Sequence, residues 1–286
     1  MSPICPISLE RKLEQISLII YGIYGCGKSH LAGTAPRPLY LDFEGGVGTL
    51  TNLTCEACGR RYWLDRDGGC DKCSDLGGDV FQVTDAASLK LALEAAEVIY
   101  KVRDLDEEKK KKAEEWLISR FGEVVSLNTK TIVIDTLSRM QEYEVIGILD
   151  SRDNKRSETE DVMEMREWGV LLTRMYRLMK ILPNQGFNII MLCQAREFED
   201  PHTKRRKWLP NLRGQFGDQV GAYCDLVGYL EIRDEMVGPG QRKTIRRLHF
   251  QPSGDFVAKS RYSQVPSYLD NPTFAQIQEA VLAARK

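Results

Sequence analysis

The sequence predicts an α/β fold with a mainly parallel central sheet and antiparallel strands towards the C-terminus. Over the first two thirds, short apolar segments rich in β-branched residues alternate with helical segments, and several short strands follow one another in the last third. A chain of 286 residues, 42% of them hydrophobic, can bury one large core. We therefore expect a single domain over residues 1–286, with a small insert at residues 52–78.

The first half of the chain predicts three strands and three helices around a compositional break. A β-branched run at residues 17–21 predicts the first strand, which leads into a glycine-rich loop and a helix. Residues 38–42 predict the second strand. The composition then changes abruptly to Cys, Gly and charge at residues 52–78, which we interpret as an insert. Residues 80–83 resume the core as a short strand, and residues 85–121 predict two helices.

The middle of the chain predicts two buried strands separated by helices. The strand TIVID at residues 131–135 is followed by a helix that ends near residue 149. Residues 151–160 are polar and charged, which indicates a loop. A long amphipathic helix is expected over residues 161–182, and the apolar run NIIMLC at residues 188–193 predicts the next buried strand.

The last third predicts a loop, an antiparallel edge and a final helix. Residues 195–214 are polar, basic and interrupted by prolines, so we expect a surface loop there. Pro272, at a first helical position after Asp270 or Asn271 as the cap, predicts a C-terminal helix. The antiparallel strands expected at one edge of the sheet are residues 222–232, 243–251 and 255–260.

Charge and hydropathy narrow the function classes. The formal net charge is −1, so any nucleic-acid surface would have to be local. The apolar stretch at residues 16–23 is too short to span a bilayer, and no signal-peptide pattern precedes it. We therefore expect a soluble, cytoplasmic protein with no membrane partner. Four scattered cysteines are expected to be thiols: Cys5, Cys26, Cys193 and Cys224.

Residues 22–29, GIYGCGKS, fit the phosphate-loop pattern GxxxxGK[ST]. Glycines let backbone N–H groups turn inward around phosphates, Lys28 reaches the β- and γ-phosphates, and the Ser29 hydroxyl joins the Mg²⁺ shell. The helix that follows would aim its positive end at the same anion, and it would lower the thiol pKa of Cys26. The sequence thus predicts that ATP and Mg²⁺ are bound. The expected nucleotide-binding residues are Gly22, Ile23, Tyr24, Gly25, Cys26, Gly27, Lys28, Ser29 and His30.

Polar side chains follow three other predicted strands, at the edge where open α/β sheets bind ligands. Asp135 ends TIVID and fits an outer-sphere carboxylate for Mg²⁺, or alternatively a cap of the next helix. Glu44 is a candidate to orient the attacking water, with Asp42 as its competitor and a surface turn as the alternative reading. Gln194 could sense the γ-phosphate, or it could satisfy loop backbone groups.

The segments GIYGCGKS, LDFEGG, TIVID and MLCQ, in this order, resemble the core of RecA-type ATPases. The closing segments LPNLRGQFGDQVGAYCDLVGYL and AKSRYSQVP resemble the phage-encoded RecA-like nucleotide-binding proteins, the minimal recombinase or annealing-ATPase group. The resemblance covers nearly the whole chain except residues 52–78 and 85–121. It implies a RecA-like P-loop core, Glu44 as the catalytic base and, for a phage protein, the host cytoplasm.

The same resemblance implies an oligomer. Lys259 and Arg261 are similar to the basic pair that RecA-type filaments and ring helicases insert into a neighbour's active site, where such cations stabilise the transition state. The alternative is two solvated strand charges. A ring or filament hydrolysing ATP at subunit interfaces is therefore expected. The candidate catalytic residues are Lys28, Glu44, Asp135, Gln194, Lys259 and Arg261.

In RecA-type proteins, loops after the Walker B and sensor strands face DNA, which here implies residues 151–160 and 196–213. The second segment is basic, so it could neutralise phosphates, and a tryptophan there could stack on a base. The alternative is a solvated basic loop. Single-stranded DNA is the expected partner, with a single-strand-binding or annealing protein as a further candidate. The candidate DNA-binding residues are Lys204, Arg205, Arg206, Lys207, Trp208 and Arg213.

The insert at residues 52–78 contains two CxxC pairs, which predict a zinc-ribbon-like site. Tetrahedral Zn²⁺ takes four such ligands, and a short insert without a core needs a metal to hold it. Disulfides or an iron–sulfur cluster are the alternatives. The basic and aromatic residues between the pairs would either contact single-stranded nucleic acid or pack against the metal site. The expected zinc ligands are Cys55, Cys58, Cys70 and Cys73.

Three functions fit these observations. The first is a DNA-stimulated ATPase that binds single-stranded DNA and promotes annealing or strand exchange. The second is a ring-forming helicase or translocase, which the lack of a recognisable primase or second helicase domain disfavours. The third is a non-enzymatic module in which ATP switches assembly. The presence of Glu44, Gln194 and the pair Lys259 and Arg261 favours hydrolysis.

Overall fold

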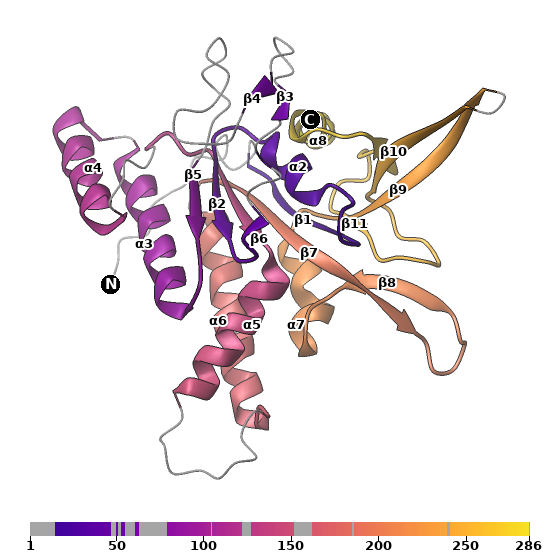
Figure 1. The fold of residues 1–286 in the computed structure, drawn as a ribbon, viewed down its shortest axis with the longest axis horizontal. Helices are drawn as coiled ribbons and strands as arrows, with labels where there is room; N and C mark the ends of the chain where they lie inside the picture. Colours follow the sequence, from indigo (N-terminus) through magenta and orange to yellow (C-terminus); the bar gives the residue numbers. More distant parts are fainter. Residues whose placement is uncertain are drawn as a thin grey trace.

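The fold is known from a computed structural model. It describes residues 15–46, 50, 53–54, 61–62, 79–103, 105–121, 127–151, 162–184, 186–238 and 241–285. A ten-stranded sheet forms its centre, with helices on both faces (Figure 1). The path of the sheet runs through β12 (Tyr268–Asp270), β10 (Gln241–His249), β9 (Leu226–Gly238), β1 (Ser17–Gly22), β7 (Asn188–Glu199), β6 (Thr131–Asp135), β2 (Pro38–Asp42) and β5 (Asp79–Gln82).

The sheet is mixed and mostly parallel, which confirms the predicted fold class. The strands β1, β2, β5, β6 and β7 are parallel, and β9 also runs parallel to β1. The later strands β10 and β12 are antiparallel, as are β11 (Lys259–Ser260) on β9 and β8 (Arg206–Pro210) on β7. A separate antiparallel pair joins β3 (Leu53–Thr54) to β4 (Arg61–Tyr62).

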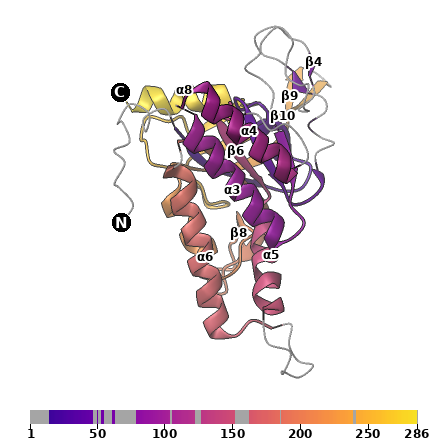
Figure 2. The same cartoon turned by 90° about the vertical axis from the view of Figure 1, so that its left-hand side faces the viewer.

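Two buried clusters separate the sheet from the helices on its two faces. One face of the sheet packs against α2 (Lys28–Gly33) and α8 (Phe274–Ala284). The opposite face is covered by the helices between β5 and β9, and Figure 2 shows α3 and α4 beside the α5–α6 pair. These helices are α3 (Ala86–Val102), α4 (Glu107–Phe121), α5 (Leu137–Asp150), α6 (Met165–Asn184) and α7 (Gly214–Gln219).

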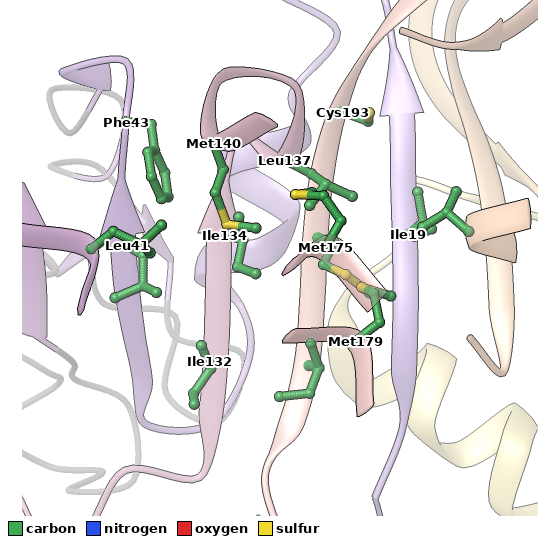
Figure 3. Packing of buried hydrophobic residues seen from close by; sticks show 14 of the residues in the cluster. Ile19, Leu41, Phe43, Ile132, Ile134, Leu137, Met140, Met175, Met179 and Cys193 are labelled. Carbon is green, nitrogen blue, oxygen red and sulfur yellow. The ribbon is translucent and has the colours of Figure 1, made fainter. Parts of the chain in front are cut away.

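Alternation along the strands creates the two clusters. Successive side chains of a strand point to opposite faces, so Ile132 and Ile134 belong to one cluster and Val133 to the other. Met175 and Met179, four residues apart on α6, lie on one face of that helix and pack over the same side of the sheet (Figure 3). This packing fixes the strand ends, which carry the polar residues considered below.

Residues 195–214 are not the surface loop expected from their polarity. The strand β7 continues past the core to Glu199, turns back into β8, and the two form an antiparallel hairpin that extends from the sheet (Figure 1). The expected strand at residues 255–260 is also shorter, since only β11 is regular. Within the described residues, no helix is both long and apolar enough to cross a bilayer.

The C-terminal helix starts later than its sequence suggests. Thr273 caps α8, and Thr273 and Gln276 form a reciprocal capping box. Neither Asp270 nor Asn271 is free for this role. Asp270 belongs to β12, and the side chain of Asn271 accepts the backbone N–H of Arg246 at 3.0 Å.

Candidate functional site

The ends of four strands meet at one edge of the sheet. Gly22 on β1 pairs in register with Gln194 on β7, and Asp42 on β2 pairs with Asp135 on β6. Because these strands are parallel, the residues that follow their apolar runs reach the same edge. The predicted catalytic residues that come together there are Lys28, Glu44, Asp135 and Gln194.

The glycine-rich loop between β1 and α2 closes around a lysine. A Cβ on Gly22 would lie 2.3 Å from the carbonyl oxygen of Leu230, so only glycine allows this close approach. Gly27 has a φ of 97°, in the left-handed region that favours glycine. The buried Lys28 Nζ donates to the carbonyl oxygens of Gly22 and Ile23 at 3.0 and 2.9 Å. Its ammonium is thus held inside the loop.

The other residues of the loop differ in exposure. Ile23, Tyr24 and His30 are exposed, whereas Cys26 is fully buried. Burial raises the pKa of the Cys26 thiol despite the nearby Lys28 ammonium. The buried thiol is shielded from solvent, which favours an incidental Cys26 over a thiol-sensitive one.

A carboxylate and a hydroxyl lie where Mg²⁺ is expected. The Ser29 hydroxyl donates to Asp135 Oδ2 at 2.6 Å. Burial raises the pKa of Asp135 to about 6, and the neighbouring Glu44 and Asp42 carboxylates add to this rise. A buried carboxylate beside two others is stabilised by a cation, so the donor set fits Mg²⁺. Among the described residues no group of three His, Cys, Asp or Glu side chains is placed to hold a metal ion.

Glu44 is held by two donors at the mouth of the site. The Thr136 hydroxyl donates to Glu44 Oε1 at 2.8 Å, and the Gln194 amide lies 3.5 Å from both carboxylate oxygens. The same Gln194 side chain accepts from Lys28 Nζ at 3.4 Å through Oε1. A pocket of about 480 Å³ opens beside Glu44 and Gln194. The amide thus links the loop lysine to the candidate base.

Asp42, the competing candidate, has a different position. It is buried, and its Oδ1 accepts the backbone N–H groups of Glu44, Gly45 and Gly46 at 3.1, 3.0 and 3.3 Å. This oxygen therefore shapes the turn that carries Glu44. The other oxygen, Oδ2, is buried without a hydrogen-bond partner among the described residues.

Arg246 on β10 lies against the phosphate loop, a position that the sequence does not indicate. A Cβ built on Gly27 would lie 2.6 Å from Arg246 Nε and 2.9 Å from its Cδ. In the sequence, Arg246 lies in the predicted strand at residues 243–251, with no motif or spacing that relates it to Gly27. The proximity of Arg246 to Gly27 depends on the pairing of β10 with β9, which lies beside β1.

The basic hairpin of β7 and β8 has two chemically different faces. Residues paired across the hairpin share a face, so Glu197, Glu199 and Arg206 lie on one side, and Arg206 is within 3.5 Å of both glutamates. Arg196 and the pair Phe198–Lys207 occupy the other side. All of these side chains are exposed, and Arg196 and Lys207 make no ion pair with the described residues.

The other DNA candidates differ in their availability. Lys204 lies 3.7 Å from Glu199, and Arg205 is exposed. Trp208 is partly buried and packs against the core cluster, which removes it from the free aromatic position expected for stacking. Arg213 precedes α7, and its backbone N–H donates to Gln141 at 2.7 Å.

Lys259 and Arg261 lie at the opposite edge of the sheet from the phosphate loop of their own chain. The register of β11 puts Lys259 beside Val227, level with Ile19 near the start of β1. Lys259 Nζ donates to the carbonyl oxygens of Gly221 and Cys224 at 2.6 and 3.1 Å. Arg261 donates to Ala222 at 2.7 Å. In this chain both side chains therefore hold the segment before β9.

The four predicted zinc ligands, Cys55, Cys58, Cys70 and Cys73, lie outside the described residues. The same holds for nearly all of the predicted loop at residues 151–160. The zinc-ribbon-like insert at residues 52–78 thus remains a prediction from cysteine number and spacing.

Comparison with known proteins gives a matching family and matches among solved structures. A family model described as an AAA domain matches residues 14–262. Among solved structures, the chain is similar to "Crystal structure of the RadB recombinase", with 16% identity, a TM-score of 0.34, and 84% of each chain covered. No curated protein matches the chain with significant similarity.

Proposed function

The chain belongs to the AAA domain family, and from this premise we propose that it binds ATP with Mg²⁺ and hydrolyses it. In this proposal the loop from Gly22 to His30 holds the phosphates, and Lys28 contacts the β- and γ-phosphates. Ser29 and Asp135 hold Mg²⁺, which would neutralise charge on the phosphates. These roles rest on a motif whose partners converge at one sheet edge.

Glu44 acts in this proposal as the general base. Its carboxylate, oriented by Thr136 and Gln194, accepts a proton from the water that attacks the γ-phosphorus. The terminal P–O bond breaks, and ADP and phosphate leave. The pocket beside Glu44 and Gln194 gives the water and the leaving phosphate room next to the base.

We further propose that single-stranded DNA regulates this reaction in annealing or strand exchange. The single observation that carries the proposal is the set of contacts made by Gln194. Its side chain touches Lys28 and Glu44, while its backbone oxygen accepts the N–H of Asn211, which closes the β7–β8 hairpin, at 2.7 Å. A ligand that moves the hairpin would therefore shift the amide that positions the base.

The test is ATP turnover with and without single-stranded DNA. We expect turnover in the absence of DNA and a severalfold higher rate with it, measured as released phosphate at saturating ATP. No turnover in either condition would favour the alternative in which ATP only switches assembly. ATP-driven separation of a duplex would favour a helicase or translocase instead.

Removing the unpaired cations of the hairpin should weaken binding of single-stranded DNA. We expect the double variant Arg196→Ala/Lys207→Ala to lose about tenfold in affinity at moderate salt, and the salt slope to fall by about 0.7 per lost phosphate contact. The matched control is Arg206→Ala, because that charge is already balanced by two glutamates. Fluorescence anisotropy across a salt series measures both. An equal loss in Arg206→Ala would exclude the assignment to this face.

For the oligomer, we propose that Lys259 and Arg261 serve the active site of a neighbouring copy. The register of β11 places both residues away from the phosphate loop of their own chain, so a catalytic role for them would require the active site of another copy. Their bonds to carbonyl oxygens of the segment before β9 would then position this edge for the neighbour. Sedimentation with an ATP analogue and single-stranded DNA would detect the assembly.

A further inference from the structure

The strongest unassigned feature near the nucleotide site is the guanidinium of Arg246. The side chain is in contact with Gly27, since any Cβ at that glycine would overlap Arg246 Nε and Cδ. The backbone of Arg246 is anchored on both sides by Asn271, whose N–H donates to the Arg246 carbonyl at 2.6 Å and whose Oδ1 accepts from the Arg246 N–H at 3.0 Å. The strand is thus fixed where its side chain meets the loop.

The charge of Arg246 is not used by the protein itself. The side chain is exposed and makes no ion pair with the described residues. The adjacent Arg247 differs: its guanidinium bonds to both carboxylate oxygens of Asp270, at 2.6 and 2.7 Å, and to Glu235 at 3.1 Å. One arginine of the pair is therefore structural, and the other presents a free cation to the phosphate loop.

Arg246 approaches the loop from the side opposite to the hydrolysis residues. In the sheet, β1 lies between β9 and β7, so Gln194 and Asp135 lie on one side of the loop and β10 lies on the other. Lys28 is directed towards Gln194. On the far side, the Arg246 side chain lies against Gly27, the residue that directly precedes α2.

From this arrangement we infer that Arg246 binds the α- and β-phosphates of the nucleotide in the same chain. With the γ-phosphate at Glu44 and Gln194, the α- and β-phosphates would lie towards Gly27, where the guanidinium lies. Arginine donors form strong charge-assisted hydrogen bonds to phosphate oxygens. The inference rests on the proposed function and adds a residue to its binding site.

A contact to the α- and β-phosphates predicts a specific kinetic pattern. ATP and ADP share these phosphates. Negative charge develops on the β-phosphate as the γ-phosphoryl group leaves, whereas the α-phosphate keeps its charge. A contact made mainly to the α-phosphate therefore strengthens the ground state and the transition state almost equally, which raises affinity with little effect on the rate at saturation. A cation that stabilised the γ-phosphate in the transition state would instead change kcat.

The experiment compares Arg246→Ala with Arg242→Ala, which removes the same charge from an exposed position on the same strand. We expect Arg246→Ala to raise the Kd of both ATP and ADP about tenfold and KM by a similar factor, with a much smaller change in kcat at saturating ATP. Arg242→Ala should change neither constant appreciably. The conservative variant Arg246→Lys should recover part of the affinity. Titration calorimetry and phosphate release measure these constants.

The outcomes separate this inference from the proposed function. If the wild-type chain binds no nucleotide, the proposed function fails. If the wild type binds ATP and Arg246→Ala binds equally well, only the Arg246 inference fails. Equal losses of affinity in Arg246→Ala and Arg242→Ala would show an effect of net charge alone. A lower kcat with unchanged Kd would show that Arg246 acts in the hydrolysis step. Either result overturns the assignment.

Discussion

Glu44→Gln is expected to reduce ATP turnover by about 10²- to 10⁴-fold, the contribution typical of a positioned general base. The glutamine keeps the size of the side chain and can still bond to Thr136, but it cannot accept the proton of the attacking water. ATP affinity should stay within about twofold of the wild type, because Glu44 is placed at the water and not among the phosphate-binding groups. Phosphate release and calorimetric ATP titration measure the two quantities.

Two controls make this expectation specific. Glu142→Gln removes a carboxylate from the wall of the same pocket, where Glu142 is paired with Arg139 at 2.6 Å, and basal turnover should be retained. Asp42→Asn keeps an oxygen that can accept the three backbone N–H groups now bound by Asp42 Oδ1. Loss of turnover in Asp42→Asn with normal turnover in Glu44→Gln would make Asp42 the base and refute the assignment.

The residues around Glu44 were predictable because their strands are buried. Apolar runs such as TIVID and NIIMLC predict strands, and in a parallel sheet the first polar residue after each run must lie at the common edge. This reasoning brings Asp135 and Gln194 to the phosphate loop from sequence alone. The contacts that link Gln194 to both Lys28 and Glu44 depend on side-chain geometry, which a linear pattern does not contain.

The sequence does not predict the hairpin of β7 and β8, because these strand segments are not buried. Over residues 196–199 and 206–207 the side chains on both faces of the hairpin are exposed, so the sequence there lacks the alternation of apolar and polar residues that marks a half-buried strand. Arg206 and Trp208 look like free DNA-binding residues in a list of basic and aromatic letters. Cross-strand pairing instead brings Arg206 into ion pairs with two glutamates, and Trp208 packs on the core.

The position of Arg246 and the cap of α8 illustrate a second limit of prediction from sequence. Neither the contact of Arg246 with Gly27 nor the choice of Thr273 as a cap follows from local preference, since Asp270 and Asn271 are equally good capping residues. The pairing of β12 with β10 decides both, because it takes Asp270 into a strand and sets Asn271 against the backbone of Arg246. Long-range strand pairing overrides the local preference.

Asp225→Ala is expected to lower the free energy of unfolding by about 1–3 kcal/mol, the cost of leaving the donors that it holds without an acceptor. The Asp225 side chain is 14% exposed and accepts from the Ser17 backbone N–H and hydroxyl at 2.9 and 2.8 Å. Arg261 and Arg285 lie 3.6 and 3.7 Å from its oxygens. The carboxylate thus joins the starts of β1 and β9 to the C-terminal segments, and alanine would leave a buried N–H without its acceptor.

Urea denaturation of three variants tests this role. Asp225→Asn keeps the oxygen that Ser17 needs and removes the charge, so its loss should be smaller than that of alanine. Asp234→Ala, an exposed aspartate on β9 bonded to Thr244 at 2.7 Å, is the matched control and should cost within about 0.5–1 kcal/mol. Equal losses in Asp225→Ala and Asp234→Ala would show that the network contributes no more than a surface bond.

The variant Arg261→Ala distinguishes two roles for Arg261, which belongs to the same network. As a cation donated to a neighbouring active site, Arg261 should be required for turnover, and Arg261→Ala should bind ATP normally while losing most of its activity. As a purely structural partner of Asp225, it should lower stability and leave the turnover of the folded fraction intact. Arg261 is 47% exposed in the single chain, so its contact with Asp225 is screened by solvent and contributes little to stability. We therefore expect Arg261→Ala to lose most of its turnover while its free energy of unfolding changes little. A destabilised variant with normal turnover of the folded fraction would remove Arg261 from the catalytic set.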